Sequence, residues 1–204
     1  TCVFDDGYYQ ALNGWCMKKY DWSFKKEELT FSPGVIPALY QLVEDLVKPY
    51  NGKVLTLTPA YGFFLHACEY NDVELVPSPL QKQGGAFRVD WEDFEKKAAD
   101  PTVRMVMLCN PHNPSGRVWS EEELQKMAEI IEKNDLWVVS DEIHCDFVPP
   151  EHPHTTFGLL GEEVLRHSMV CYSSNKGFNL GGLGMATLVL ADDDLRCKFN
   201  EEMS

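Results

Sequence analysis

Short apolar runs alternate along the chain with amphipathic stretches of helical periodicity, and this alternation constrains the fold more than any other feature. The run 103–109 is apolar almost throughout, which is typical of a strand buried on both faces of a sheet. The stretch 36–48 gathers its apolar side chains on one wide helical face. Ser120 and Glu123 form a capping-box pattern ahead of another helical stretch, which reaches about Lys133. A strand–helix–strand order of this kind predicts a mostly parallel sheet with helices on both faces.

The predicted fold class is therefore α/β, with three layers in α/β/α order around a mostly parallel, mixed sheet of seven strands. We expect an N-terminal helical segment (1–28), a large domain (29–191) and the start of a further helix (192–204). The predicted helices span 36–48, 63–70, 91–99, 121–133 and 162–166. The predicted strands span 29–31, 54–58, 73–76, 103–109, 136–140, 169–172 and 187–190.

The charge balance argues against a nucleic-acid partner, because 18 Lys and Arg residues stand against 32 Asp and Glu residues, a net charge of −14. No apolar run approaches the roughly 20 residues of a membrane helix, and no signal-peptide pattern opens the chain. The seven cysteines include no C-x-x-C pair and are interpreted as buried free thiols in a reducing compartment. These features favour a cytoplasmic protein with small-molecule chemistry. The Pro-rich stretch around His152 and His154 is expected to be a surface loop, not a zinc site.

Polar residues follow five of the predicted strands. In parallel α/β sheets, ligands collect beyond the carboxyl ends of the strands, so these segments are expected to meet at one rim. The five segments are 32–34, 58–61, 110–113, 141–144 and 173–176.

Lys176 is the only lysine between Lys133 and Lys198, and it lies in a segment of small residues between two apolar runs. Burial there would disfavour the ammonium form and expose a nucleophilic amine. A neutral amine is what a lysine needs to form a Schiff base with an aldehyde cofactor. The alternative is an ordinary solvated loop lysine.

Three motifs in register resemble one enzyme family. The segment 109–116, Cys-Asn-Pro-His-Asn-Pro-Ser-Gly, is similar to the Asn-Pro-x-Asn-Pro-x-Gly signature of class I and II pyridoxal-phosphate (PLP) enzymes. The segment 139–144, Val-Ser-Asp-Glu-Ile-His, resembles the strand whose aspartate meets the pyridine ring, and 173–183 resembles the cofactor-lysine segment. The first two motifs together point to the branch of PatB/MalY-like cystathionine β-lyases, and the resemblance covers nearly the whole chain.

The resemblance implies a role for each motif. Lys176 would hold PLP covalently and later move the Cα proton of the substrate, with a solvated lysine as the alternative. Asp141 would keep the pyridine nitrogen protonated; otherwise it is a helix N-cap after a strand. Asn113 would bond the ring O3′ oxygen; otherwise it belongs to a plain turn.

Further residues are implied around the rest of the cofactor. His144 would reach O3′ or hold Asp141, unless it is a structural histidine. Tyr61 would stack on the ring face, unless it is a core tyrosine. The phosphate would meet free backbone N–H groups at the start of a helix and the hydroxyl of Ser173, which is otherwise a loop serine. The N–H groups are those of Gly34, Val35 and Ile36.

Two departures from the family pattern stand out. Many aminotransferases carry a phosphate-binding arginine eight residues after the lysine, and this position is Gly184 here, which agrees with the β-lyase branch. The family also continues into a smaller C-terminal domain, which carries the arginine for the substrate carboxylate. We therefore expect a large-domain fragment whose PLP-binding domain is 29–191 and whose last residues lead toward that missing domain.

The resemblance implies a PLP-dependent C–S β-lyase that converts sulfur amino acids to thiol, pyruvate and ammonia, and that forms a homodimer. A PLP-dependent aminotransferase is the first alternative. A catalytically impaired large-domain fragment, or a non-catalytic cofactor-binding remnant, is the second. A dinucleotide-binding sheet is a weaker rival, because no G-x-G-x-x-G follows the first strand.

Overall fold

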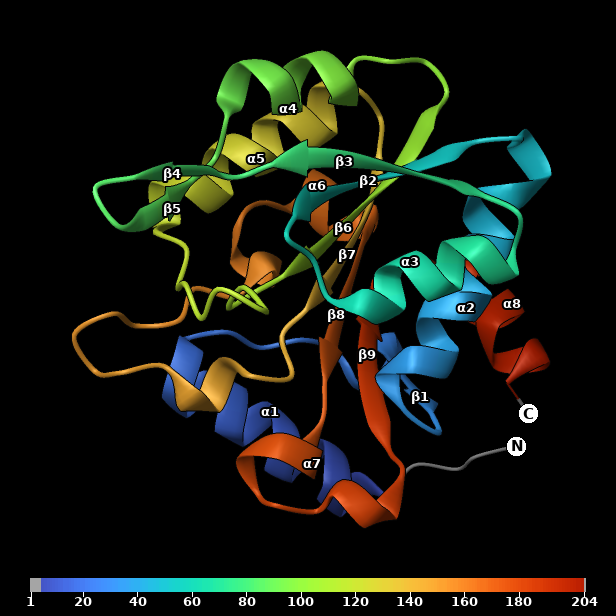
Figure 1. Cartoon of the computed structure of the whole chain (residues 1–204). Helices are drawn as coiled ribbons and strands as arrows, with labels where there is room; N and C mark the ends of the chain where they lie inside the picture. Colours follow the sequence, from blue (N-terminus) through green and yellow to red (C-terminus); the bar gives the residue numbers. More distant parts are fainter. Residues whose placement is uncertain (1–4, 204) are drawn as a thin grey trace.

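A mixed seven-stranded sheet forms the centre of the computed structural model, which describes residues 5–203 (Figure 1). The strand order is β1-β9-β8-β7-β6-β2-β3, and β9 alone runs antiparallel to its neighbours. The predicted α/β fold is confirmed. The strands are β1 (Leu29–Ser32), β2 (Lys53–Thr58), β3 (Glu74–Pro79), β6 (Val103–Cys109), β7 (Trp137–Asp141), β8 (Ser168–Tyr172) and β9 (Ala186–Leu190).

Helices cover both faces of the sheet and bury a separate apolar cluster on each (Figure 1). On one face lie α2 (Val35–Leu46), α3 (Gly62–Tyr70) and α8 (Asp193–Glu202). On the other lie α1 (Asp6–Tyr20), α4 (Trp91–Ala98), α5 (Glu121–Lys133) and α6 (Glu162–Arg166). The short α7 (Ser174–Gly177) follows the carboxyl end of β8. Short 3₁₀ turns complete the chain: η1 (Lys26–Glu28), η2 (Lys48–Tyr50), η3 (Cys145–Phe147), η4 (Phe157–Leu159) and η5 (Gly181–Leu183).

The predicted capping box at the start of α5 is present. The Ser120 hydroxyl accepts the Glu123 N–H at 3.3 Å, and the Glu123 carboxylate accepts the Ser120 N–H at 3.1 Å. Two otherwise unpaired helix donors are thereby satisfied. A short hairpin that the sequence did not predict follows β3. That hairpin pairs β4 (Gln81–Gln83) with β5 (Ala86–Arg88).

The terminal helices pack onto the sheet. Cys16 and Tyr20 of α1 join the same cluster as α5, while Leu195 and Phe199 of α8 join the cluster of α2 and α3. The division into 1–28, 29–191 and 192–204 stays a prediction. No helix within residues 5–203 is long and apolar enough to cross a membrane.

Two expectations about polar and sulfur side chains need correction. His154 is not on a surface loop: its side chain is fully buried against Glu142, whereas His152 is exposed. The contact with the buried Glu142 carboxylate stabilises His154 in the interior. Cys197 is exposed, because it lies on the outer side of α8, and Cys2 lies outside the described residues. The other five cysteines are free and buried as predicted: Cys16, Cys68, Cys109, Cys145 and Cys171.

A close contact between η4 and the segment after α1 gives a first testable prediction. A Cβ atom added at Gly158 would lie 2.3 Å from ring carbons of the buried Trp22. Gly158→Ala is therefore expected to lower the free energy of unfolding by about 1–3 kcal/mol, measured by urea denaturation. Gly14→Ala is the control, because a Cβ at this exposed position inside α1 meets nothing within 4 Å. It should raise stability by about 0.5–1 kcal/mol. An unchanged unfolding midpoint for Gly158→Ala would contradict the packing described here.

Candidate active site

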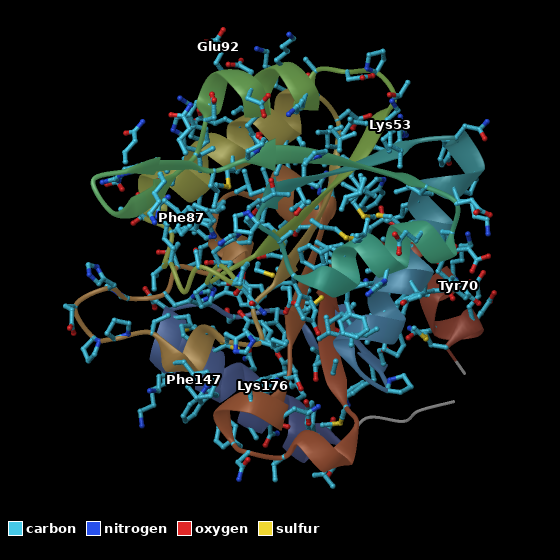
Figure 2. The ribbon with its side chains drawn as sticks, viewed as in Figure 1. Lys53, Tyr70, Phe87, Glu92, Phe147 and Lys176 are labelled. Carbon is cyan, nitrogen blue, oxygen red and sulfur yellow. The ribbon has the colours of Figure 1, made fainter. Side chains whose placement is uncertain are left out.

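The carboxyl ends of β1, β2, β6, β7 and β8 lie at one edge of the sheet, because these five strands run parallel to one another. We call this edge the rim. The central strand β7 ends there at Asp141. Figure 2 shows Lys176 on α7, beyond the end of β8. The sheet therefore brings the five predicted polar segments to one edge, as expected from the strand order along the chain.

Asp141 is buried at the rim, with only 4% of its surface exposed. Two thiols flank it on the same rung of the sheet, Cys109 on β6 and Cys171 on β8. One carboxylate oxygen accepts the Ile143 N–H at 3.3 Å. Burial raises the pKa of Asp141 to about 7, although the Ile143 bond and the charge of Lys176 act in the opposite direction. A cationic partner would stabilise the ionised form of a carboxyl group that is buried in this way.

Lys176 is exposed, so its side chain is solvated and burial does not favour a neutral amine here. The lysine belongs to a four-residue helix at the rim, and its neighbours Gly177 to Leu180 are exposed as well. The amine nevertheless lies near the acid and the histidine, since its charge lowers the pKa of both Asp141 and His144. The structure thus brings Lys176, Asp141 and His144 together.

Asn113 and His144 line a common cavity of about 360 Å³ beside the loop that follows β6. The backbone N–H of Asn113 lies close enough to the Cys109 thiol to lower its pKa, although burial has the larger effect and raises it. His144 is half-buried, and burial followed by the Lys176 charge holds its pKa below the usual value. A neutral imidazole can accept as well as donate a hydrogen bond at this cavity.

Tyr61 follows β2 and precedes α3, so it reaches the rim from the other side of β6. Its ring is half-buried and packs against Phe63 and Phe64, with ring centroids 5.4 and 5.9 Å away. Burial and the nearby charge of Asp141 raise the pKa of the Tyr61 hydroxyl. Tyr61 therefore lies within electrostatic reach of Asp141, and its stacking role stays a prediction.

The start of α2 offers backbone donors at the rim. Gly34 is the N-cap residue and supplies no side-chain cap, so the N–H groups of Val35 and Ile36 are not capped by it. Helix N-termini of this kind favour anions. Gly184 lies beside this turn, because a Cβ atom there would be 3.3 Å from the Pro33 carbonyl oxygen.

Ser173 serves as the N-cap of α7. Its hydroxyl donates to the Met185 carbonyl at 2.8 Å and accepts the Asn175 N–H at 3.2 Å. A bond from this hydroxyl to a phosphate would require it to leave the Met185 carbonyl, so the phosphate role of Ser173 stays a prediction.

No site role was predicted from the sequence for two histidines near this edge. His112 is buried and bonds the Ser115 hydroxyl at 2.7 Å, and burial lowers its pKa to about 4. His154 pairs with Glu142, whose carboxylate lies at 2.8 Å. No local pattern joins Glu142 to a histidine twelve residues further along the chain. The only signal was a second carboxylate directly after a buried strand.

Comparison with known proteins identifies the family. The sequence model for aminotransferase class I and II matches residues 8–197. The chain belongs to this family. It is 38% identical over 193 residues to cystathionine β-lyase PatB of Bacillus subtilis, a match that covers 95% of this chain and 50% of PatB. The family assignment agrees with the order of the three motifs.

Solved structures of class I and II relatives share the fold. The PLP-bound C–S lyase from Staphylococcus hominis has a TM-score of 0.91 at 35% identity, covering 98% of this chain and 51% of the lyase. Cystalysin from Treponema denticola, which contains PLP, has a TM-score of 0.93 at 30% identity, covering 98% of this chain and 50% of cystalysin. The chain thus spans about half the length of the relatives that it matches.

Proposed function

We propose that the rim binds PLP and supports C–S β-lyase chemistry on sulfur amino acids such as cystathionine. The observation that carries the proposal is the buried Asp141 carboxyl at the end of the central strand, with the Lys176 amine close enough to influence its pKa. The likeness to a cystathionine β-lyase and to a PLP-bound C–S lyase supports it further.

The residues at the rim fit the charges of PLP. Within residues 5–203, Asp141 forms no ion pair, although its carboxyl is withdrawn from water. A protonated ring nitrogen supplies the missing cation and favours the ionised carboxylate. For the phosphate end of the cofactor, the backbone N–H groups of Gly34, Val35 and Ile36 lie at the start of α2, where an anion is favoured. Lys176 lies on the segment between β8 and β9 and supplies the amine.

The proposed chemistry divides among these side chains. When bound, PLP accepts the electron pair that remains when the substrate Cα loses its proton. Lys176 would hold the cofactor through its Nζ atom and, once freed by the substrate amine, would take the Cα proton. Asp141 would hold the proton on the ring nitrogen. In the net reaction, the Cβ–S bond would break, the sulfur would leave as a thiol with the proton lost from Cα, and water would convert the remainder to pyruvate and ammonia.

Other rim residues orient the cofactor in this proposal. Asn113 would bond the O3′ oxygen together with His144, and Tyr61 would cover one ring face. Ser173 adds a hydroxyl near the phosphate if it exchanges its bond to Met185. Because Gly184 has no side chain that could bind the phosphate, backbone N–H groups and hydroxyls would be its donors.

Incubation with cystathionine separates the lyase from an aminotransferase. The chain supplemented with PLP is expected to release thiol and pyruvate in equal amounts without any added 2-oxo acid. Thiol reagent and lactate-dehydrogenase assays measure the two products. A reaction without PLP, and one with the Lys176→Ala variant, are the controls. Product that forms only when a 2-oxo acid is added would support the aminotransferase and overturn the lyase.

The proposal extends to assembly and location. Apolar side chains exposed near the rim, Phe178, Leu180 and Leu183, support a homodimer that covers this surface. The five buried free thiols support a reducing, cytoplasmic setting. Sedimentation of the purified chain and of a Leu183→Ser variant tests the first point, and an association that is equal in both would count against it.

A further inference from the structure

The carboxylate of Glu142, one residue after Asp141, is fully buried and lies at the centre of a polar cluster. Five groups from separate parts of the chain donate to it, and they satisfy both of its oxygens. Oε1 accepts from the Ser140 hydroxyl at 2.9 Å, the Phe157 N–H at 2.8 Å and the Asn110 amide at 3.4 Å, and Oε2 from His154 Nε2 at 2.8 Å and the Tyr172 hydroxyl at 3.1 Å. A buried carboxylate is tolerated when it is paired and bonded in this way.

The cluster keeps Glu142 ionised. Burial pushes the pKa of Glu142 upward, but the charge and hydrogen bond of His154, together with the Phe157 N–H, bring it below its ordinary value. Removal of one partner would leave the buried carboxylate with fewer donors, so the members are expected to support one another.

Three members of the Glu142 cluster lie at the ends of neighbouring strands. Asn110 follows β6, Glu142 itself follows β7, and Tyr172 ends β8. In the proposed function, each of these strand ends carries a residue near the cofactor: Asn113 follows Asn110, Asp141 precedes Glu142, and Lys176 follows Tyr172. The Glu142 side chain therefore joins the three strand ends that carry these residues.

The contacts of His154 extend the cluster to α1. Its ring packs edge-on against Tyr20, with centroids 5.1 Å apart, and draws the segment before η4 into the core. The Asn110 amide also donates to the Thr155 carbonyl at 2.8 Å, next to His154. The loop after β6 and the segment 154–157 are thus held against the same carboxylate.

We propose that Glu142, paired with His154, is a positioning residue that fixes the relative placement of Asn113, Asp141 and Lys176 for PLP. The proposal rests on the proposed function, because it assigns these three residues to the cofactor. Glu142 does not touch the cofactor in this proposal; it acts through the strand ends.

The test uses Glu142→Gln, which keeps the shape and removes the charge. We expect PLP to bind at least 10-fold more weakly in an absorbance titration of the full chain. We also expect the induced circular dichroism of the cofactor in the saturated protein to weaken, because the ring is then held less rigidly. Tyr172→Phe removes one contact and keeps the packing, so it should weaken binding by about 2–5-fold and gives a second measurement if Glu142→Gln does not fold.

The matched control is Ile131→Ala, which opens a buried site near the far end of α5, away from the rim. It should lower the melting temperature without changing PLP affinity or the dichroism. If Glu142→Gln and Tyr172→Phe also change only the melting temperature, Glu142 has a structural role alone and the inference is overturned. If the unaltered chain binds no PLP, the proposed function fails and this inference fails with it.

Discussion

Lys176→Ala is expected to abolish covalent attachment of PLP and to lower lyase activity by about 10³-fold or more, since it removes both the attachment point and the base. The fold should be unaffected, because the lysine side chain is exposed on a four-residue helix. We expect the change in unfolding free energy to stay within about 0.5 kcal/mol. Borohydride reduction of the PLP-treated chain, followed by peptide mass analysis, measures the attachment directly.

The control for this experiment is Lys82→Ala, at an exposed lysine on the β4–β5 hairpin. This variant should keep both the reduced cofactor adduct on the 176 peptide and the activity. An adduct that persists in Lys176→Ala would show that another amine holds the cofactor. In that event the assignment of the rim as the active site would be wrong.

Asp141→Asn is expected to have opposite effects on function and on stability. Without the carboxylate, the ring nitrogen of PLP loses its partner, and lyase activity should fall by about 10²–10³-fold. The cofactor-free chain should become more stable at pH 8, because the variant no longer buries a charge there. Activity assays and urea denaturation of the same preparation measure both effects.

The sign of the stability change follows from the pKa. Burial raises the pKa of Asp141 from 3.8 to about 7, so the folded chain holds a proton that the unfolded chain releases between these values. The contribution of Asp141 to stability therefore falls as the pH rises from about 4 to about 7, by at most about 4 kcal/mol. Asp141→Asn should remove this loss, with little difference from the unaltered chain at pH 4. Equal stability gains at pH 4 and pH 8 would contradict the raised pKa.

The fold could be predicted because its signals are local. An apolar run such as 103–109 or a capping box such as Ser120 with Glu123 favours one element whatever surrounds it. The β4–β5 hairpin was missed, because its strands are short and largely exposed and leave no alternating pattern. Exposure of Lys176 and burial of His154 could not be predicted either. Both depend on partners that only the folded chain supplies.

The site was predictable in outline for a related reason. Strand order places the segments after β6, β7 and β8 at one edge, and the family resemblance assigns their side chains. Neither source says how that edge is held together. The Glu142 carboxylate depends on partners up to 32 positions away, such as Asn110, and these contacts emerge from packing alone.

The reversed direction of β9 has a consequence for how the lysine segment moves. Because β8 and β9 are adjacent and antiparallel, with Tyr172 opposite Thr187, the segment 173–185 leaves and re-enters the sheet at neighbouring positions. It can open by local unfolding while both strands keep their ladder hydrogen bonds. Amide protons of 173–185 should then exchange with solvent much faster than those of β8 and β9. Slowing of that exchange when PLP is added would report the ordering of this hairpin-like loop, independently of turnover.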